Sequence, residues 1–358
     1  MRSRVTALAA CLITLGCAAQ PPLAAPAPSP SSTPTVSAPS ASATPTTEIS
    51  ERWVQVPGLS TDTAWERGLR DVTAVGPELA WAIGYTGWED SVRTSLRTWD
   101  GSRWRAVPVE DALGGLASID SDGPRNAWML GGGFDEALAQ HWDGHAWRRY
   151  RLSGYGRDVA VDGRRVVVIS DTAVLTWNGT AFVTEKVLGG EETRLVAVDS
   201  GAGHTWVAGM RDSVRPVIWH GHNGGYEETT LPEGILTTIL QISPDDVWAV
   251  GGIGERPLVL HWNGRSWERP TIPPWKGELQ SVTAFGPDDV WFAGEDHDEP
   301  GGVSVLHWDG RNWTKEVPPP GGEGHRALIE RIPGTSQLWL MVDVANGDSE
   351  SIVTFRRE

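Results

Sequence analysis

The sequence predicts an all-β fold, a seven-bladed β-propeller whose blades are four-stranded antiparallel sheets, and three observations support this prediction. A short apolar strand, usually with a central Trp, recurs seven times along the chain. Six copies are followed by a turn of the form Trp-Asp/Asn-Gly with an aromatic residue three positions later, one of them degenerate around Trp219. Successive turns lie 43, 35, 42, 43 and 46 residues apart. Repeats of about 40–45 residues with four short strands are typical of propeller blades.

The apolar strand is the first motif of each repeat. Its residues alternate in polarity with a period of two, as in Val303–Trp308, and no long stretch has the apolar stripe of a helix. Residues 165–169 read Arg-Val-Val-Val-Ile and are a degenerate copy without the Trp. The remaining copies are residues 80–84, 127–131, 205–209, 247–251, 290–294 and 338–341.

The second motif predicts the hairpins that join the outer strands. Asp-Gly and Asn-Gly between apolar runs are strong hairpin signals, because both residues tolerate a positive φ. The first blade is expected from Asp71 to about Glu110. The inner strands of the other six are expected to start near Leu116, Asp158, Arg194, Leu236, Leu279 and Arg326.

The last repeat ends at Glu358 without an outer strand. The missing strand is expected from the other end of the propeller, since Arg52–Pro57 matches the outer-strand segment Arg103–Pro108. We therefore expect the N-terminal segment to complete the last blade and close the ring, so that no sheet of the ring is left incomplete.

The beginning of the chain resembles a bacterial lipoprotein signal. A charged segment, Met1–Arg4, precedes an apolar run too short to span a bilayer, and Cys17 follows. The resemblance implies that residues 1–16 are a signal peptide and that Cys17 is lipidated. Cys11 is the alternative lipidation site, and an ordinary secretory signal is the alternative for the whole segment.

Residues 17–50 are expected to be a disordered tether, and residues 51–358 the propeller. The stretch 18–47 has no charged residue and is rich in Ala, Pro, Ser and Thr, so it lacks the apolar surface that ordering requires. Together with the signal, this segment predicts a domain anchored by lipid on the extracytoplasmic face of the cell membrane.

Composition excludes several classes of function. The 358 residues carry a net charge of −16, which argues against nucleic-acid partners because phosphates attract basic surfaces. No Cys follows Cys17, so disulfides, thiolate catalysis and Cys-bound metals are excluded from the propeller. Of the 20 Trp, 17 lie at positions of the repeat, where blade packing explains them.

The repeat resembles the kelch-type propellers, which include the central domain of galactose oxidase, and the Trp-rich propeller lipoproteins of bacterial envelopes. In the kelch pattern an apolar strand ends in a Gly pair and two aromatic residues follow. The best-matching blades are Val250–Gly252 with Trp262 and Trp267, and Leu130–Gly132 with Trp142 and Trp147. The resemblance implies the fold and no particular function. The copper chemistry of galactose oxidase requires a Cys–Tyr crosslink, which this propeller cannot form, so we predict no cofactor.

Two groups of polar residues are candidates for metal binding. His141, His261 and His307 each precede the Trp of the second motif, but they occupy equivalent positions in different blades. We expect them to form hydrogen bonds between blades rather than to bind metal. The acidic loop Glu295–Glu299 is expected to be solvated, with Ca²⁺ binding as the alternative.

Trp65, Trp88 and Trp275 lie outside the repeat, in loops that a propeller places on one face. Aromatic rings flanked by carboxylates suit a sugar, a cationic group or a protein partner. We therefore predict a ligand-binding face around these rings. Its candidate carboxylates are Glu89, Asp90, Asp296 and Asp298.

These observations predict a monomeric, non-catalytic module that binds an extracytoplasmic protein or glycan, without a metal or another cofactor. The alternative is an extracytoplasmic glycan hydrolase or lyase that uses loop carboxylates as acid and base. No phosphate-binding loop, dinucleotide fingerprint or nucleophile elbow occurs in the sequence.

Overall fold

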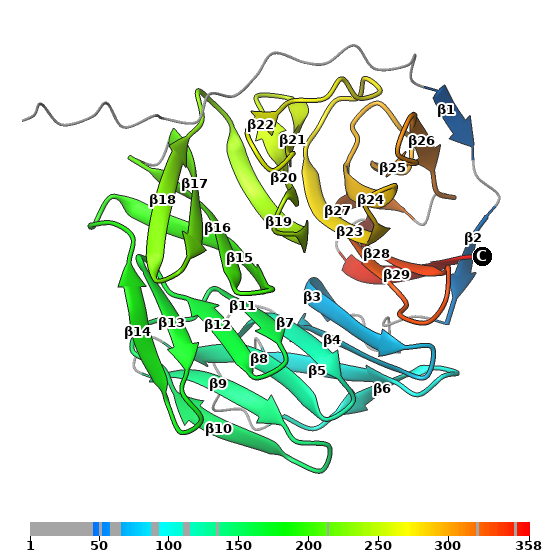
Figure 1. Cartoon of the computed structure of the whole chain (residues 1–358). Coiled ribbons are helices and arrows are strands. Elements are labelled where there is room, and N and C mark those ends of the chain that lie inside the picture. The colour runs from blue at the N-terminus through cyan, green and yellow to red at the C-terminus, as the bar shows by residue number, and fades with distance from the viewer. Residues whose placement is uncertain are drawn as a thin grey trace, which may run out of the picture. The chain divides into compact units, whose positions relative to one another are not determined.

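The computed structural model describes residues 46–49, 52–57, 66–86, 93–109, 115–133, 136–212, 215–319, 322–346 and 349–358. These ranges contain strands and turns and no helix, and therefore no helix that could span a membrane. Seven antiparallel sheets surround a common centre, which confirms the predicted seven-bladed propeller (Figure 1).

Each blade is numbered from its inner strand outward. Blade 1 contains β3 (Glu66–Gly76), β4 (Leu79–Thr86), β5 (Arg93–Trp99) and β6 (Trp104–Val107). Blade 2 contains β7 (Leu116–Gly123), β8 (Asn126–Gly133), β9 (Glu136–Trp142) and β10 (Trp147–Arg151). Blade 3 contains β11 (Asp158–Asp162), β12 (Arg165–Ile169), β13 (Ala173–Trp177) and β14 (Phe182–Val187). All strands within these blades pair with their sequence neighbours.

The next three blades repeat the arrangement. Blade 4 contains β15 (Thr193–Gly201), β16 (His204–Arg211), β17 (Arg215–His222) and β18 (Gly225–Thr230). Blade 5 contains β19 (Ile235–Ser243), β20 (Asp246–Ile253), β21 (Arg256–Trp262) and β22 (Trp267–Glu268). Blade 6 contains β23 (Leu279–Gly286), β24 (Asp289–Glu295), β25 (Val303–Trp308) and β26 (Trp313–Val317). The predicted starts of the inner strands agree with the observed starts to within one residue in blades 2 to 6. The inner strands of the first and last blades begin earlier than predicted, at Glu66 and Glu323 instead of Asp71 and Arg326.

Blade 7 is completed by the N-terminal segment, as the sequence predicts. It consists of β27 (Glu323–Arg331), β28 (Leu338–Asn346), β29 (Ser349–Arg357) and the outer strand β2 (Trp53–Val56). β2 pairs antiparallel with β29, with Trp53 opposite Arg357. The ring is thus closed by pairing of strands from opposite ends of the chain.

A buried carboxylate fastens this closure to the neighbouring blade. Glu316 of β26 accepts a hydrogen bond from the indole Nε1 of Trp53 at 2.9 Å. It also accepts bonds from the guanidinium of Arg357 at 2.9 and 3.1 Å. The Arg357 guanidinium in turn lies over the ring of Trp291, 4.3 Å from its centroid. One side chain of blade 6 therefore holds β2 and β29, the two outer strands of blade 7.

Blade 6 has a fifth strand that the sequence does not predict. β1 (Thr46–Ile49) pairs in parallel with the outer strand β26, with Thr46 opposite Thr314. These four residues belong to the segment 17–50, which was expected to be disordered. The exposed backbone edge of β26 supplies the hydrogen-bonding partners that order them. The rest of that segment, and the signal peptide with Cys17, lie outside the described residues.

The hairpin turns between the third and fourth strands have the predicted backbone. Their glycines all adopt a positive φ, and the preceding Asp or Asn side chain accepts bonds from backbone N–H groups two and three residues later, as at Asp100 and Asn178. These glycines are Gly101, Gly144, Gly179, Gly264 and Gly310, with φ between 84° and 98°.

The prediction that the repeated histidines bond between blades is wrong. Each imidazole instead bonds to an Asn or Asp of its own blade and stacks on the Trp of the adjacent strand, because the strand register places His and Trp opposite each other on one face. The bonds join His141 to Asn126 at 3.0 Å, His261 to Asp246 at 2.9 Å and His307 to Asp289 at 2.9 Å. The ring centroids are 4.5, 4.1 and 3.8 Å apart for Trp128–His141, Trp248–His261 and Trp291–His307.

Candidate functional site

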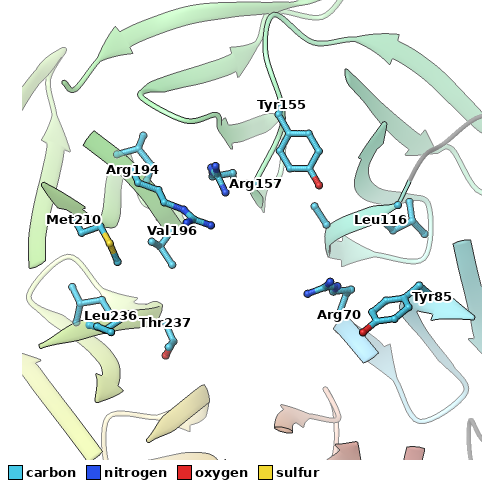
Figure 2. Close-up of a pocket in the computed structure, with 14 residues that line it drawn as sticks. Arg70, Tyr85, Leu116, Tyr155, Arg157, Arg194, Val196, Met210, Leu236 and Thr237 are labelled. Carbon is cyan, nitrogen blue, oxygen red and sulfur yellow. The ribbon is translucent and has the colours of Figure 1, made fainter. Parts of the chain in front are cut away.

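A pocket of about 850 Å³ opens at the centre of the ring, where the inner strands begin. Its lining comes from five of the seven blades, because every inner strand starts at this face (Figure 2). Its polar and charged side chains are Arg70, Tyr85, Tyr155, Arg157, Arg194 and Thr237. We call this pocket the mouth.

A repeated backbone irregularity builds the mouth. In six of the seven blades the first inner-strand residues are interrupted by a register shift that leaves one residue without a partner on the second strand. A β-bulge of this kind redirects a side chain and often lies beside a functional site. In order along the chain, the bulge residues are Arg70, Ala117, Val196, Thr237, Gln280 and His325. The first four line the mouth.

Blade 3 has no such bulge, and Arg157 occupies the corresponding place directly before β11. In blades 1 to 5 the repeat therefore places one such side chain at the mouth, and its residue type differs from blade to blade.

Three guanidinium groups gather at the mouth of this acidic chain. Arg70 lies over the ring of Tyr85, with 5.0 Å between its guanidinium carbon and the ring centroid. Arg157 pairs with Asp171 through Nε at 2.7 Å and lies 6.0 Å from the centroid of Tyr155. Figure 2 shows the side chains of Arg70 and Arg194 extending toward the open centre.

Arg194 differs from the other two arginines because it has neither an aromatic ring, as Arg70 has, nor a carboxylate, as Arg157 has, as its partner. Its side chain is exposed, and within the described ranges it makes no hydrogen bond or ion pair. In a chain of net charge −16, a guanidinium without a carboxylate partner at the rim of a pocket is a ready site for an anionic group.

The side of the mouth that carries Arg194 is also lined by apolar side chains, since Met210 is the cross-strand partner of Arg194. Met210 and Leu236 line it, and Ile235 at the start of β19 is 52% exposed. An exposed branched aliphatic side chain beside a pocket is a contact surface for another apolar group. The mouth thus combines basic and aromatic side chains from blades 1 and 3 with an arginine beside apolar side chains in blades 4 and 5.

Beneath the arginines, two aspartates share one hydroxyl group. The Oγ of Ser118 lies 2.9 Å from Asp71 and 2.6 Å from Asp158. A hydroxyl donates only one hydrogen bond, so one of the two carboxyl groups must carry a proton to complete the pair. Burial, with a smaller contribution from the charge of Asp158, raises the pKa of Asp71 to about 7. A neutral carboxyl here lessens the negative charge below the mouth.

These aspartates also join the blades. Asp71 accepts a hydrogen bond from the backbone N–H of Ile119 at 2.9 Å, and Asp158 from that of Val198 at 2.8 Å. The same contact recurs from Asp120 to Val161, from Asp199 to Gln241 and from Ser281 to Ile329. The carboxyl groups nearest the mouth are therefore occupied by structural bonds.

The structure does not place Trp275 on an open surface, where the sequence predicted it. Its ring is 5% exposed and packs in an apolar cluster with Val259 and Phe292. The ammonium of Lys315 lies 5.8 Å from its centroid. Trp275 is buried because the segment after β22 folds back over blades 5 and 6 instead of projecting as a loop.

Asp296 is fully buried rather than solvated. Lys315 Nζ pairs with it at 2.7 Å and with Glu299 at 2.9 Å, and Ser304 donates a further bond to Asp296 at 2.6 Å. The expectation of a solvated acidic loop is therefore wrong at this residue, because a buried lysine neutralises it. Asp298 is exposed, and its backbone N–H donates to Asp296 at 3.1 Å.

The remaining predicted ligand-binding residues, Trp65, Trp88, Glu89 and Asp90, lie outside the described residues, so binding by them stays a prediction. Where the structure is described, no group of three His, Asp, Glu or Cys side chains is arranged to hold a metal ion.

Sequence reasoning missed the arginines and tyrosines of the mouth. The sequence does contain a pattern that marks the bulge residues, Arg70 among them. Near the start of five inner strands, a buried Leu is followed by a residue that differs between blades and then by a small or acidic residue. These segments are Leu69–Asp71, Leu116–Ser118, Leu195–Ala197, Leu236–Thr238 and Leu279–Ser281. The central position of each is the bulge residue.

Comparisons with known proteins support the fold alone. Neither the scan of protein families nor the search of curated proteins found a match. Among solved structures, the chain resembles YCF48 from Cyanidioschyzon merolae, with 16% identity, a TM-score of 0.58, and coverage of 86% of this chain and 98% of the other. It also resembles U3-55K, with 14% identity, a TM-score of 0.58, and coverage of 82% and 98%.

A third similar structure is the WD40 repeat domain of RRP9, with 15% identity, a TM-score of 0.56, and coverage of 85% of this chain and 99% of the other. The chain shares their propeller fold. These structures are of the YCF48 and WD40 types, so the resemblance to kelch-type propellers and to envelope lipoproteins stays a prediction.

Proposed function

We propose that this chain is a lipid-anchored, extracytoplasmic module that binds an acidic segment of a protein partner at the mouth of its propeller. The observation that carries the proposal is the convergence of Arg70, Arg157 and Arg194 with two tyrosines on a rigid, bulge-built ring. The predicted lipoprotein signal and tether support the location.

The chemistry of the mouth favours an acidic peptide segment. Guanidinium groups bind carboxylates in a bidentate manner, and tyrosine rings provide contact area with little loss of side-chain entropy. The apolar side chains of Met210 and Ile235 suit aliphatic side chains next to the acidic ones. A neutral glycan would leave the charge of Arg194 unused, so we favour protein over glycan.

The described carboxylates give less support to a glycan hydrolase or lyase. Asp296 is neutralised by Lys315, and Asp71 and Asp158 are bonded to neighbouring blades. The same geometry suits a binding scaffold, because these groups hold the ring beneath the ligand.

Site-specific crosslinking in cells tests the mouth as the binding surface. A photo-crosslinking amino acid replaces Ile235 in the full chain, and adducts are compared with and without Arg70→Glu and Arg194→Glu. We expect a defined protein adduct that the two charge reversals abolish and that Arg265→Glu retains, because Arg265 lies on a hairpin turn of the opposite face. Adducts that persist in the mouth variant would reject the proposal.

The membrane anchor is tested separately by Cys17→Ser, with Cys11→Ser as the matched control. We expect only Cys17→Ser to release the chain from the membrane fraction. Release by Cys11→Ser alone would move the anchor to Cys11, and retention of both variants would reject a lipid anchor.

A further inference from the structure

The turn between the first and second strands of a blade lies on the face opposite the mouth, and its charge changes around the ring. In blades 1 to 6 this turn has two residues. The second of them is acidic in blades 1, 5 and 6, as Glu78, Asp245 and Asp288, but it is Arg125 in blade 2 and Arg164 in blade 3. Because these two blades are neighbours, both arginines belong to one boundary (Figure 1).

The turn region of blade 3 is one residue shorter than that of blade 2. In blade 2 a register shift leaves Asp122 unpaired just before the turn, whereas blade 3 reaches its turn without a shift. In blade 2 the side chain of Arg125 lies against Gly144 of the outer hairpin. The equivalent glycine of blade 3, Gly179, has no such neighbour, since no described part of the chain comes within 4 Å of the place that its β-carbon would take.

A pocket of about 650 Å³ occupies this space between blades 2 and 3. Trp128 and Val166 line it and are buried, so they form its floor, and the ring of Trp177 beside them is half-buried. Arg125 and Arg164 line it from the two turns, and both are exposed. We call this cavity the turn pocket.

Three side chains of the turn pocket carry hydrogen-bond donors that no described residue uses. The guanidinium groups of Arg125 and Arg164 make no hydrogen bond or ion pair within the described chain. The side chain of Asn178 is bonded only through its oxygen, which accepts from Thr180 and Ala181. Its amide N–H groups are therefore available to a ligand.

The indole of Trp177 supplies a further donor. In blades 1 and 2 the equivalent indole N–H donates to the carbonyl of the proline in the turn, from Trp99 at 2.9 Å and from Trp142 at 3.2 Å. Blade 3 has Gly163 at the place of this proline, and the Trp177 N–H has no acceptor among the described residues.

The imidazole of His141 supplies an acceptor. Its Nε2 lies 3.0 Å from Oδ1 of Asn126, whose amide nitrogen donates to Asp122 at 2.7 Å. Nε2 therefore carries the proton, and Nδ1 keeps its lone pair. Burial lowers the pKa of His141, so the ring is uncharged at neutral pH. The turn pocket thus combines several donors with one uncharged acceptor.

The acidic residues next to the turn pocket are held by bonds of their own. Asp122 accepts from the backbone N–H of Gly163 at 2.6 Å, and Asp143 pairs with Arg148 at 2.9 Å. Asp162 accepts from a backbone N–H of blade 4 at 3.2 Å. Among the described residues that line the pocket there is no carboxylate, so its charged side chains are all basic.

We propose that the turn pocket binds an acidic sugar residue of a polysaccharide, such as a hexuronate. Its carboxylate binds Arg125 and Arg164. Its hydroxyl groups bond to the Asn178 amide and to Nδ1 of His141, and its ring lies against the indole of Trp177. This site lies on the face opposite the mouth and does not depend on the function proposed for the mouth.

The mixture of groups in the turn pocket favours a sugar over an acidic peptide. A sugar ring presents hydroxyl groups, which both donate and accept, around an apolar face of C–H groups. The amide, the uncharged imidazole and the indole match these features, whereas the carboxylates of a peptide would engage the arginines alone.

Fluorescence anisotropy with a labelled trisaccharide of galacturonate, added to the purified chain, tests this proposal. We expect Arg125→Ala with Arg164→Ala to weaken binding by at least about tenfold, because the carboxylate loses two charged donors. Arg265→Ala, at an exposed hairpin turn of blade 5 on the same face, is the matched control and should leave binding unchanged. Unchanged binding by the double variant, or no binding by the unaltered chain, would overturn the proposal.

Two further ligands separate an acidic sugar from other ligands. The fully methyl-esterified trisaccharide keeps its rings and loses its charge, and we expect it to bind at least about tenfold more weakly. A peptide of alternating Glu and Val carries the charge without the sugar ring and should not displace the trisaccharide. Equal binding of the ester, or displacement by the peptide at an equal concentration of carboxylates, would reject an acidic sugar as the ligand.

Two single variants test the position of the sugar. Trp177→Phe keeps an aromatic ring and removes the indole N–H, and we expect it to weaken binding severalfold. Full binding by this variant would contradict the contact with the indole. Loss of binding in Arg194→Glu, with full binding in the Arg125/Arg164 variant, would place the sugar in the mouth and overturn the turn pocket as its site.

Discussion

The boundary between blades 3 and 4 combines a mainly aliphatic cluster, which includes Val167 and Trp219, with a network of polar contacts. The boundaries on either side of it are filled mainly by tryptophan rings. Between blades 2 and 3, Trp128 packs against Trp177 and Phe182, with centroids 5.1 and 5.3 Å apart. Between blades 4 and 5, Trp206 packs against Trp262 and Trp267 at 5.5 and 5.7 Å. In blade 3 the equivalent position is Val167, opposite Thr176 instead of a histidine.

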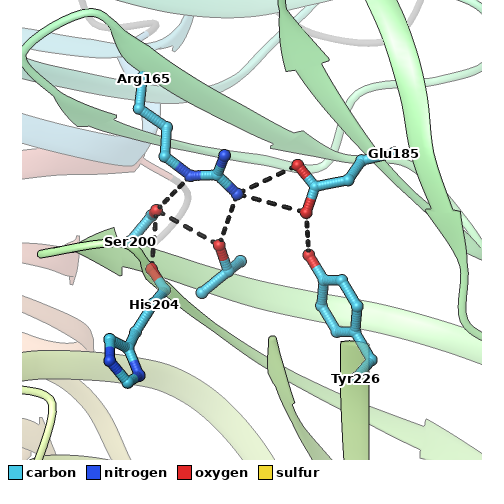
Figure 3. A network of polar contacts seen from close by, with 6 residues as sticks. Arg165, Glu185, Ser200, His204 and Tyr226 are labelled. Carbon is cyan, nitrogen blue, oxygen red and sulfur yellow. Dashed lines mark hydrogen bonds and ion pairs between the residues drawn. The ribbon is translucent and has the colours of Figure 1, made fainter. Parts of the chain in front are cut away.

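Arg165 of blade 3 forms hydrogen bonds across the boundary where the tryptophan of the first motif is missing. Its guanidinium bonds to Glu185 at 3.1 Å and to Thr205 at 3.0 Å, and its Nε bonds to Ser200 at 3.2 Å (Figure 3). Tyr226 of blade 4 donates a further bond to Glu185 at 2.8 Å. Burial and the charge of Glu185 raise the pKa of the Tyr226 hydroxyl, so it remains a donor.

The comparison shows that a boundary between blades can be filled mainly by tryptophan rings, or by a smaller apolar cluster with hydrogen bonds beside it. Rings stabilise a boundary mainly through buried area and edge contacts, which tolerate small shifts. The hydrogen bonds of the Arg165 network depend on the relative orientation of donor and acceptor, and on the presence of every partner. Blade 3 lacks the Trp of the first motif, and the Arg165 network stabilises its boundary with blade 4 instead.

The largest expected effect comes from removing a ring at an aromatic boundary. Trp206→Ala should reduce the free energy of unfolding by about 3–5 kcal/mol, since it leaves a large cavity. Val167→Ala at the equivalent position should cost only about 1–2 kcal/mol, because fewer methyl groups are lost. Denaturant titration measures both, and equal losses would contradict the contrast between the two boundaries.

The closing boundary between blades 6 and 7 combines both kinds of contact. Glu316→Ala removes the partner of Arg357 and of the Trp53 indole in a buried setting. We expect a loss of about 3–5 kcal/mol, similar to that of an aromatic boundary. Thermal unfolding measures it against Glu358→Ala, a control at an exposed carboxylate. A loss no larger than that of the control would show that strand pairing alone closes the ring.

Substitutions in the polar network between blades 3 and 4 should cause a smaller loss of unfolding free energy. Their effects should also be more strongly coupled to one another. Arg165→Ala should cost about 1–3 kcal/mol, because Glu185 and Thr205 lose a charged donor. If the network acts as a unit, Arg165→Ala combined with Glu185→Ala should cost less than the sum of the two single variants. Strict additivity in this double-mutant cycle would reject the network as a unit.

The smallest effect is a pH dependence from the carboxyl groups that join the blades. Burial raises the pKa of Asp71 to about 7 and that of Glu330 to about 8, above their values in the unfolded chain. The folded state then holds more protons than the unfolded state, so stability falls as pH rises through these values. We expect the unfolding temperature to drop by a few degrees as pH rises from about 5 to about 8, and these groups to add no further dependence above about pH 9.

Glu330→Gln provides the test of that assignment, because glutamine keeps the shape of the side chain and cannot ionise. The pH dependence between about pH 5 and about pH 8 should become shallower in this variant. An unchanged slope would mean that other groups cause the dependence.

The repeat allowed most of the fold to be predicted, because its markers lie on the strands that pack the blades. Local sequence patterns predicted the turn glycines and most inner-strand starts. The number of strands in the last repeat, which lacks an outer strand, predicted closure by Arg52–Pro57. The strand β1 did not, because its pairing depends on the edge of β26, which is more than 250 residues away in sequence. The partners of the histidines required the strand register, which spacing alone leaves open.

The site was much less predictable than the fold. Trp275 and Asp296 stood out because they break the repeat or carry charge, but their burial depends on tertiary contacts. Trp275 packs with Val259 and Phe292, and Lys315 of the outer strand of blade 6 pairs with Asp296. Arg70 looks like an ordinary strand residue, and only the bulge turns it toward the mouth. A residue that a β-bulge turns into a site is therefore difficult to recognise from a single sequence.

The central claim, that the mouth is occupied by an acidic protein segment, is tested most directly by the reactivity of Arg194. An arginine-specific dicarbonyl reagent is applied to intact cells and to the purified chain, and modification of Arg194 and of Arg265 is quantified by peptide mapping. We predict that Arg194 is protected in cells and reactive in the purified chain, while Arg265 reacts equally in both. Equal reactivity of Arg194 in the two settings would contradict the claim.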